Sequence, residues 1–246
     1  GLRYETIDLR QVRWATTDPA RSTPTGDVRS NIDIWIPGVA AAWEFAPGMR
    51  LVGGAHRGFA SPAPGSSADA ETSWNYEAGF KFSGGAWHAE VIGYFNDYAN
   101  LVGTCTGSTG GNCNIGDQFD GGGVHVKGVE VSAGTTIGRI ADGGFQVPLA
   151  LTYTLTDARF QDAFASSYEP WGTVRKGDRL PYVPKHQLTL TAGVELERGR
   201  LSATLNMVSK ARARAGTGAV TAANRVDGRA LVDIAGQVDV VDGVSL

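Results

Sequence analysis

The chain has 246 residues, of which 42% are hydrophobic and 19% are charged, and its formal net charge is −3 at pH 7. This weakly acidic balance excludes a protein that binds nucleic acid through a basic surface, because such a surface must neutralise phosphates. The sequence also has no stretch near the ~18 consecutive apolar residues that a membrane-spanning helix needs. Its hydrophobic residues are therefore arranged for another architecture.

The chain is built from segments in which apolar and polar residues alternate. Successive side chains of a strand point to opposite faces, so this alternation predicts strands with one apolar and one polar side. Residues 145–156 (FQVPLALTYTLT) are the clearest example. The pattern predicts about ten strands, at residues 1–14, 32–46, 49–59, 72–83, 86–97, 123–136, 145–157, 184–197, 200–210 and 228–240, and an eleventh that begins at Val244.

The predicted connections alternate between short and long. The short ones are rich in Gly, Pro and Asp, as hairpin turns require, and lie at Pro47-Gly48, Ser83-Gly84-Gly85, Gly138–Gly144, Glu197–Arg200 and Val241–Gly243. The long ones are polar and lie at 15–31, 60–71, 98–122, 158–183 and 211–227. This regular pattern predicts an all-β fold, the antiparallel wall of a transmembrane β-barrel. A soluble β-sandwich is the alternative, although its loops need not alternate in this way.

Alternation alone does not say which face meets lipid, because a lipocalin-like soluble barrel would turn the apolar stripe inward. Two features favour lipid outside. The predicted polar faces carry Glu77, Lys81, His88, Glu90, Glu130 and Glu195, whereas the apolar stripes are nearly free of charge in their middles. Aromatic residues gather near strand ends, at Trp43, Phe45, Phe80, Phe82 and Trp87, as in an interfacial girdle.

The residues offer no set for catalysis or metal binding. The four histidines are scattered, and neither HExxH nor GxSxG occurs. Cys105 and Cys113 lie in a loop rich in Gly, Ser, Thr and Asn, with no His or third Cys at zinc spacing. We expect a disulfide that closes this loop in an oxidising compartment; two unrelated thiols are the alternative.

An ordered series of segments resembles the barrel wall of TonB-dependent outer-membrane receptors, with the ferric-citrate receptor branch as the best match. The series is WEFAPGMRLVGGAHRGFASPAPG, AETSWNYEAGFKFSGGAWHAEVIGYFNDYANLVG, VKGVEVSAG and LPYVPKHQLTLTAGVEL. The resemblance covers nearly the whole chain. It implies that residues 1–246 are about ten strands of a 22-stranded barrel, with the plug domain, the TonB box and the last strands missing.

The resemblance implies TonB-dependent uptake of a ferric chelate, a siderophore or ferric citrate, across the outer membrane of a Gram-negative cell. The implied partners are outer-membrane lipid and the TonB–ExbB–ExbD system, and no resident cofactor is implied. A passive or adhesive outer-membrane barrel is the alternative.

Two residues are candidates for ligand binding. Arg57 lies near the outer end of its strand, where a guanidinium suits the carboxylates of an anionic ferric chelate. Trp171 lies in the middle of a long loop and could stack on a chelate, while Trp74 and Tyr76 fit an aromatic girdle better. The charged residues on the polar faces are expected to line water or to pair with the plug.

Overall fold

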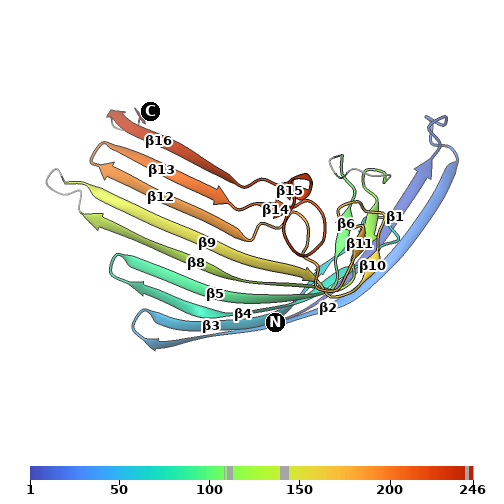
Figure 1. The fold of residues 1–246 in the computed structure, drawn as a ribbon, viewed down its shortest axis with the longest axis horizontal. Helices are drawn as coiled ribbons and strands as arrows, with labels where there is room; N and C mark the ends of the chain where they lie inside the picture. The colour runs from blue at the N-terminus through green and yellow to red at the C-terminus, as the bar shows by residue number, and fades with distance from the viewer. Residues whose placement is uncertain (108, 110–112, 139–143, 242–243, 246) are drawn as a thin grey trace.

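The computed structural model describes residues 1–107, 109, 113–138, 144–241 and 244–245, and it consists almost entirely of antiparallel strands. Eleven strands form one curved sheet in which neighbours in sequence are neighbours in space (Figure 1). In sheet order they are β1 (Leu2–Trp14), β2 (Pro24–Ala46), β3 (Met49–Ala60), β4 (Glu71–Gly84), β5 (Trp87–Asn100), β8 (Val124–Gly138), β9 (Gln146–Phe160), β12 (His186–Leu196), β13 (Gly199–Val208), β16 (Arg229–Val241) and β17 (Val244–Ser245). The predicted antiparallel barrel wall is therefore confirmed.

The first hairpin differs from the prediction. Strand β2 begins at Pro24, whereas the sequence pattern placed residues 15–31 in a loop. Its added part pairs with β1 as far as Trp14, and Arg10 donates two hydrogen bonds to Asp27 across the hairpin. This part is polar on both faces, so hydrophobic alternation, on which the prediction relied, is absent there.

The short turns close one end of the sheet, at the left of Figure 1. At the β2–β3 turn Gly48 has φ +71°, and a Cβ atom there would lie 2.0 Å from the carbonyl oxygen of Ser83. Only glycine satisfies both constraints. The predicted turns at Gly138–Gly144 and Val241–Gly243 lie partly outside the described residues.

The strand register separates polar from apolar side chains across the sheet. One row of paired positions is polar: Lys81, Glu90, Ser132, Thr152, Thr189 and Asn206. The next row, one residue along each strand, is apolar: Phe82, Ala89, Ala133, Leu151, Leu190, Leu205 and Val232. The two sides of the sheet are thus a polar face and an apolar face. In a membrane barrel the apolar face meets lipid and the polar face lines the lumen.

Aromatic side chains form two belts on the apolar face. Near the short turns Phe45 packs against Trp43 and Phe80. Toward the long loops Trp74, Tyr76 and Phe95 follow one another with ring centroids 6.2–6.3 Å apart. Trp74 and Phe82, the first and last aromatic residues of the apolar face on β4, are eight positions apart, about 26 Å at ~3.3 Å per residue. That spacing suits the ~25 Å apolar band of a membrane barrel.

The long loops contain structure that the sequence pattern did not predict. Three small hairpins lie at the other end of the sheet: β6 (Val102–Thr104) with β7 (Gln118–Asp120), β10 (Phe164–Ala165) with β11 (Thr173–Val174), and β14 (Ala211–Arg212) with β15 (Arg225–Val226). The 3-10 turn η2 (Ala222–Asn224) precedes β15. Among the described residues, no helix has the length and apolar character needed to cross a bilayer.

Candidate functional site

A recess on the polar face, near the ends of the strands that carry the long loops, is the candidate ligand contact. It has a volume of about 640 Å³ and lies across β3, β4, β5 and β8. Its lining includes His56, Ser73, Asn75, Glu77, Tyr94, Asn96 and Glu130. The register brings these side chains together because paired positions such as His56 with Asn75, and Glu77 with Tyr94, share a face.

Hydrogen bonds fix the polar groups of this polar-face recess. The Asn75 amide donates to the Ser73 hydroxyl oxygen at 3.1 Å, and the Tyr94 and Thr156 hydroxyl oxygens lie 2.8 Å apart. Gly58 leaves room for this arrangement, since a Cβ atom there would lie 2.5 Å from the Ser73 hydroxyl oxygen. The recess therefore presents ordered hydroxyl and amide groups to the lumen.

The charge of the polar-face recess is negative. Glu77 and Glu130 line it, and neither belongs to any ion pair found among the described residues. No Lys or Arg lines the recess, and the nearest paired cation on β4, Lys81, is bound to Glu90 at 2.8 Å. The geometry suits neutral hydrogen-bonding groups or a cationic partner better than an anionic one.

Arg57, which the sequence offered as a ligand-binding residue, does not lie in this recess and is on the other face of the sheet. It pairs with Trp74 in the register, so it shares the apolar face with Ala55 and Tyr76. Its guanidinium donates to the carbonyl oxygen of Trp35 at 3.3 Å. The neighbouring His56 lines the recess, together with Gly58 and Ala60 of the same strand. The glycines Gly53 and Gly54 interrupt the alternation just before Arg57, so the pattern gave a weak indication of its facing.

Trp171 also differs from the expectation, because it is buried at 5% exposure and offers no ring face to a ligand. It packs edge-on against Phe160, Phe164 and Tyr168, with centroids 5.0–5.8 Å apart. The hairpin β6–β7 fits against the same ring. Cβ atoms at Gly103 and Gly121 would come within 2.8 and 2.6 Å of it.

This aromatic cluster ties the two loops that follow β5 and β9 to the strand ends. Its fully buried members on the sheet are Val124 and Phe160, which are paired across β8 and β9 on the polar face. Ala158 on β9 and the loop residues Val174 and Leu180 complete it. The cluster therefore fixes the loops over the polar face, close to the recess.

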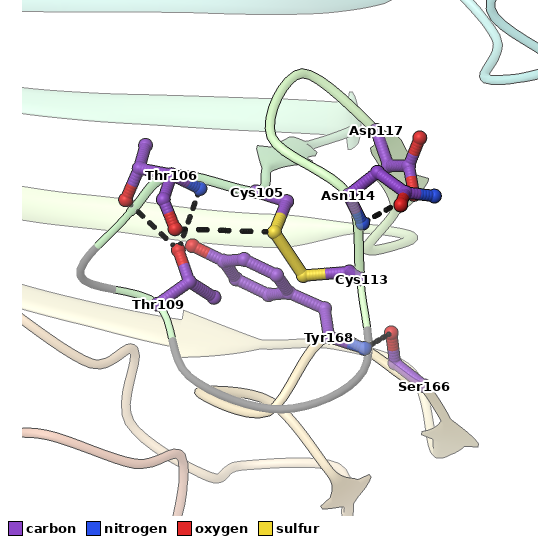
Figure 2. The surroundings of a disulfide bond; sticks show 8 residues. All are labelled: Cys105, Thr106, Thr109, Cys113, Asn114, Asp117, Ser166 and Tyr168. Carbon is purple, nitrogen blue, oxygen red and sulfur yellow. Dashed lines mark hydrogen bonds between the residues drawn. A yellow bond between two sulfur atoms is a disulfide. The ribbon is translucent and has the colours of Figure 1, made fainter.

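The structure contains a disulfide between Cys105 and Cys113 in the loop after β6 (Figure 2). The Thr106 amide donates to the Thr109 hydroxyl at 2.8 Å, and the Asn114 amide donates to Asp117 at 2.8 Å. The Tyr168 phenol reaches Thr109 from the neighbouring loop. Burial raises the pKa of the Tyr168 phenol. The disulfide thus lies where the two loops meet.

No group of three or more His, Cys, Asp or Glu side chains within the described part of the chain could hold a metal ion. Sequence reasoning identified Glu77 and Glu130 as luminal but missed His56, Ser73 and Asn75 as their neighbours. Asn75 and Glu77 are two residues apart on one strand, so the alternation of side chains could have placed Asn75 on the same face as Glu77. The place of His56 depended on the register of β3 against β4.

Comparison with known proteins agrees with this architecture. A family model described as "TonB dependent receptor-like, beta-barrel" matches residues 1–246. No curated protein sequence matches the chain. The siderophore receptor PiuA from Acinetobacter baumannii is 15% identical, with a TM-score of 0.70 over 99% of this chain and 34% of that one.

Two further receptors have the same fold. The ferric enterobactin receptor PfeA from Pseudomonas aeruginosa, solved as a mutant with enterobactin, is 19% identical over 89% of this chain and 36% of that one, with a TM-score of 0.59. The ferric yersiniabactin uptake receptor FyuA from Yersinia pestis is 16% identical over 90% and 32%, with a TM-score of 0.61. The chain thus spans about a third of the length of these receptors, and at such identities the likeness shows the fold alone.

Proposed function

This chain belongs to the family of TonB-dependent receptor-like β-barrels, and we propose that the whole receptor imports a ferric siderophore, or a similar ferric chelate, across an outer membrane. The family match over residues 1–246 is the observation that carries the proposal. Siderophore receptors among the similar structures support a ferric chelate as cargo. Proteins of this family and these structures are transport receptors and not enzymes.

In this proposal the apolar face lies in the outer membrane, the short turns face the periplasm and the long loops face outside. The chelate is recognised among the outer loops, and the TonB system supplies the energy for its passage. Residues 1–246 are part of the barrel domain, and the plug domain lies elsewhere in the receptor. The buried cluster around Trp171 gives the loops a defined shape, which a recognition surface needs.

The polar-face recess limits how these strands take part. Glu77 and Glu130 would repel an anionic chelate at close range. The cations that hold such a chelate therefore belong to other parts of the receptor. The hydroxyl and amide groups of Ser73, Asn75 and Tyr94 are suited to the uncharged parts of the cargo or to the plug.

Uptake of radiolabelled iron by cells that express the full-length receptor tests the proposal. Ferric enterobactin and ferric citrate serve as probes, each in cells with and without functional TonB. We expect uptake of at least one probe that requires TonB. Uptake that is independent of TonB would instead support a passive barrel, and the absence of both binding and uptake for all ferric chelates would contradict the proposal.

Two variants test whether the cargo passes through the polar-face recess. Asn96→Trp puts a bulky ring into the polar-face recess, whereas Ala78→Trp puts the same ring on the apolar face. Asn96→Trp should lower uptake, and Ala78→Trp should leave it unchanged. Equal uptake by both variants, at equal amounts of assembled receptor, would show that the cargo avoids this recess.

A further inference from the structure

The apolar face carries a cluster of charged side chains just beyond its aromatic belt. Lys127 on β8 is paired with Asp157 on β9, and Arg159 lies two residues further along β9. Arg179, from the loop after β11, forms a β-bridge with Arg159 and so shares its face. Three cations therefore surround one carboxylate at the end of the strands where the long loops lie.

Hydrogen bonding within this cluster leaves two cations with donors to spare. Arg159 donates to Asp157 at 2.7 Å and to the carbonyl oxygen of Gly177 at 3.2 Å. Arg179 approaches Asp157 only to 3.5 Å. Lys127 has no hydrogen bond or close ion pair among the described residues, and it is exposed. Arg179 and Lys127 can thus donate to a further anion.

The cluster borders a groove of about 740 Å³ whose other wall is apolar. Tyr76, Phe95, Val129 and Leu155 line the groove below the cations. The register puts all four on the apolar face. The groove thus runs from the apolar band of the sheet to a cationic end, as an amphiphile with a negative head group would require.

A second hollow, of about 260 Å³, continues from the same place toward β12 and β13. It shares Asp157, Arg179 and Lys185 with the groove and adds Lys210 and Arg212. Arg212 is 8% exposed, its Nε atom has no partner, and its other donors meet the carbonyl oxygens of Thr217 and Gly218. A buried guanidinium without a carboxylate favours a nearby anion.

We propose that this groove binds a membrane lipid whose head group carries a phosphate. The phosphate accepts hydrogen bonds from Arg179 and Lys127, and the acyl chain lies along Tyr76, Phe95 and Leu155. Guanidinium and ammonium groups are common ligands of phosphate, and basic clusters beside an apolar membrane surface attract anionic lipids. A lipid fits this place because the groove opens on the apolar face, opposite the polar-face recess.

The test compares lipid binding by the full-length receptor in a neutral detergent, followed by native mass spectrometry. The probes are dioleoyl phosphatidic acid, dioleoylglycerol as the matched uncharged amphiphile, and inorganic phosphate. The variant Lys127→Gln/Arg179→Gln removes the two available cations. The control variant Arg175→Gln/Lys176→Gln removes two exposed cations from the loop that carries Arg179, outside the groove.

We expect the wild-type receptor and the control variant to prefer phosphatidic acid over dioleoylglycerol by about tenfold or more, the effect of one charged hydrogen bond. The Lys127→Gln/Arg179→Gln variant should lose this preference while it keeps heat-modifiable gel mobility. Equal binding of phosphatidic acid by wild type and this variant would overturn the proposal. Inorganic phosphate that binds as tightly as the lipid would show a small-anion site instead, and tight binding of dioleoylglycerol would show a purely apolar groove.

Discussion

Replacement of Leu190 by arginine tests the assignment of the two faces. Leu190 lies on β12 between Leu151 on β9 and Leu205 on β13, and all three are on the apolar face. It is four residues from His186 and six from Leu196, the two ends of β12, or about 13 and 20 Å at ~3.3 Å per residue. This places it near the middle of the apolar band. An arginine at the bilayer midplane of a barrel costs about 2–4 kcal/mol.

The matched control is Thr152→Arg. Thr152 pairs with Thr189 at the same depth, one residue from Leu151, but it is exposed on the polar face. Thr191 also lies on the polar face, but its hydroxyl lies 3.1 Å from that of Thr204. Replacement of Thr191 would therefore remove a contact as well as add a charge, which makes Thr152 the better control. An arginine on the luminal side stays hydrated, so the free energy of unfolding should change by only about 0.5 kcal/mol.

Urea unfolding of the full-length receptor in lipid bilayers, followed by tryptophan fluorescence, measures both changes. Heat-modifiable gel mobility reports how much receptor assembles. We expect a loss of about 2–4 kcal/mol for Leu190→Arg only. Equal losses for the two variants, or a larger loss for Thr152→Arg, would refute the assignment of the apolar face to lipid.

Three further predictions concern the outer loops. Replacement of both Cys105 and Cys113 by serine should increase amide exchange in β6 and β7 and leave unfolding of the barrel unchanged. The reason is that a disulfide that closes so short a loop restrains the chain by only about 2–3 kcal/mol in the entropic account. Loss of barrel assembly would contradict this prediction. Trp171→Ala should raise amide exchange across the loops after β5 and β9, with a local cost of about 3–5 kcal/mol, whereas unchanged exchange would mean that the cluster does not hold the loops. Backbone and side-chain hydrogen bonds from Thr23 and Ser22 hold the pKa of Asp18 below its usual value. The stability that these bonds give the loop 15–23 is therefore fully present above about pH 4, near the pKa of Asp18 in the unfolded chain. It is lost as the pH falls through the lower pKa of Asp18 in the folded protein. Exchange of the Thr23 amide against pH measures this, and Asp18→Asn should remove the pH dependence.

Much of this fold could be predicted from the sequence, because a strand with one face in lipid has a local signature. Every second residue of β9 from Val147 to Leu155, and of β12 from Leu188 to Leu196, is apolar, and this rule needs no knowledge of distant residues. The turn glycines, such as Gly48, are also local signals because positive φ is a property of one residue. Thus the strands, the alternation of turns and loops, and the polar face with Glu77 and Glu130 were all predictable.

The tertiary structure decided what depends on partners far away in the chain. Strand β2 extends to Pro24 because β1 lies beside it, although its residues do not alternate. Trp171 is buried because Gly103 and Gly121 come against its ring. The groove beside Arg179 exists because a loop residue joins the edge of β9. Such contacts arise from register and packing between segments distant in sequence, and a period of two residues carries no information about either.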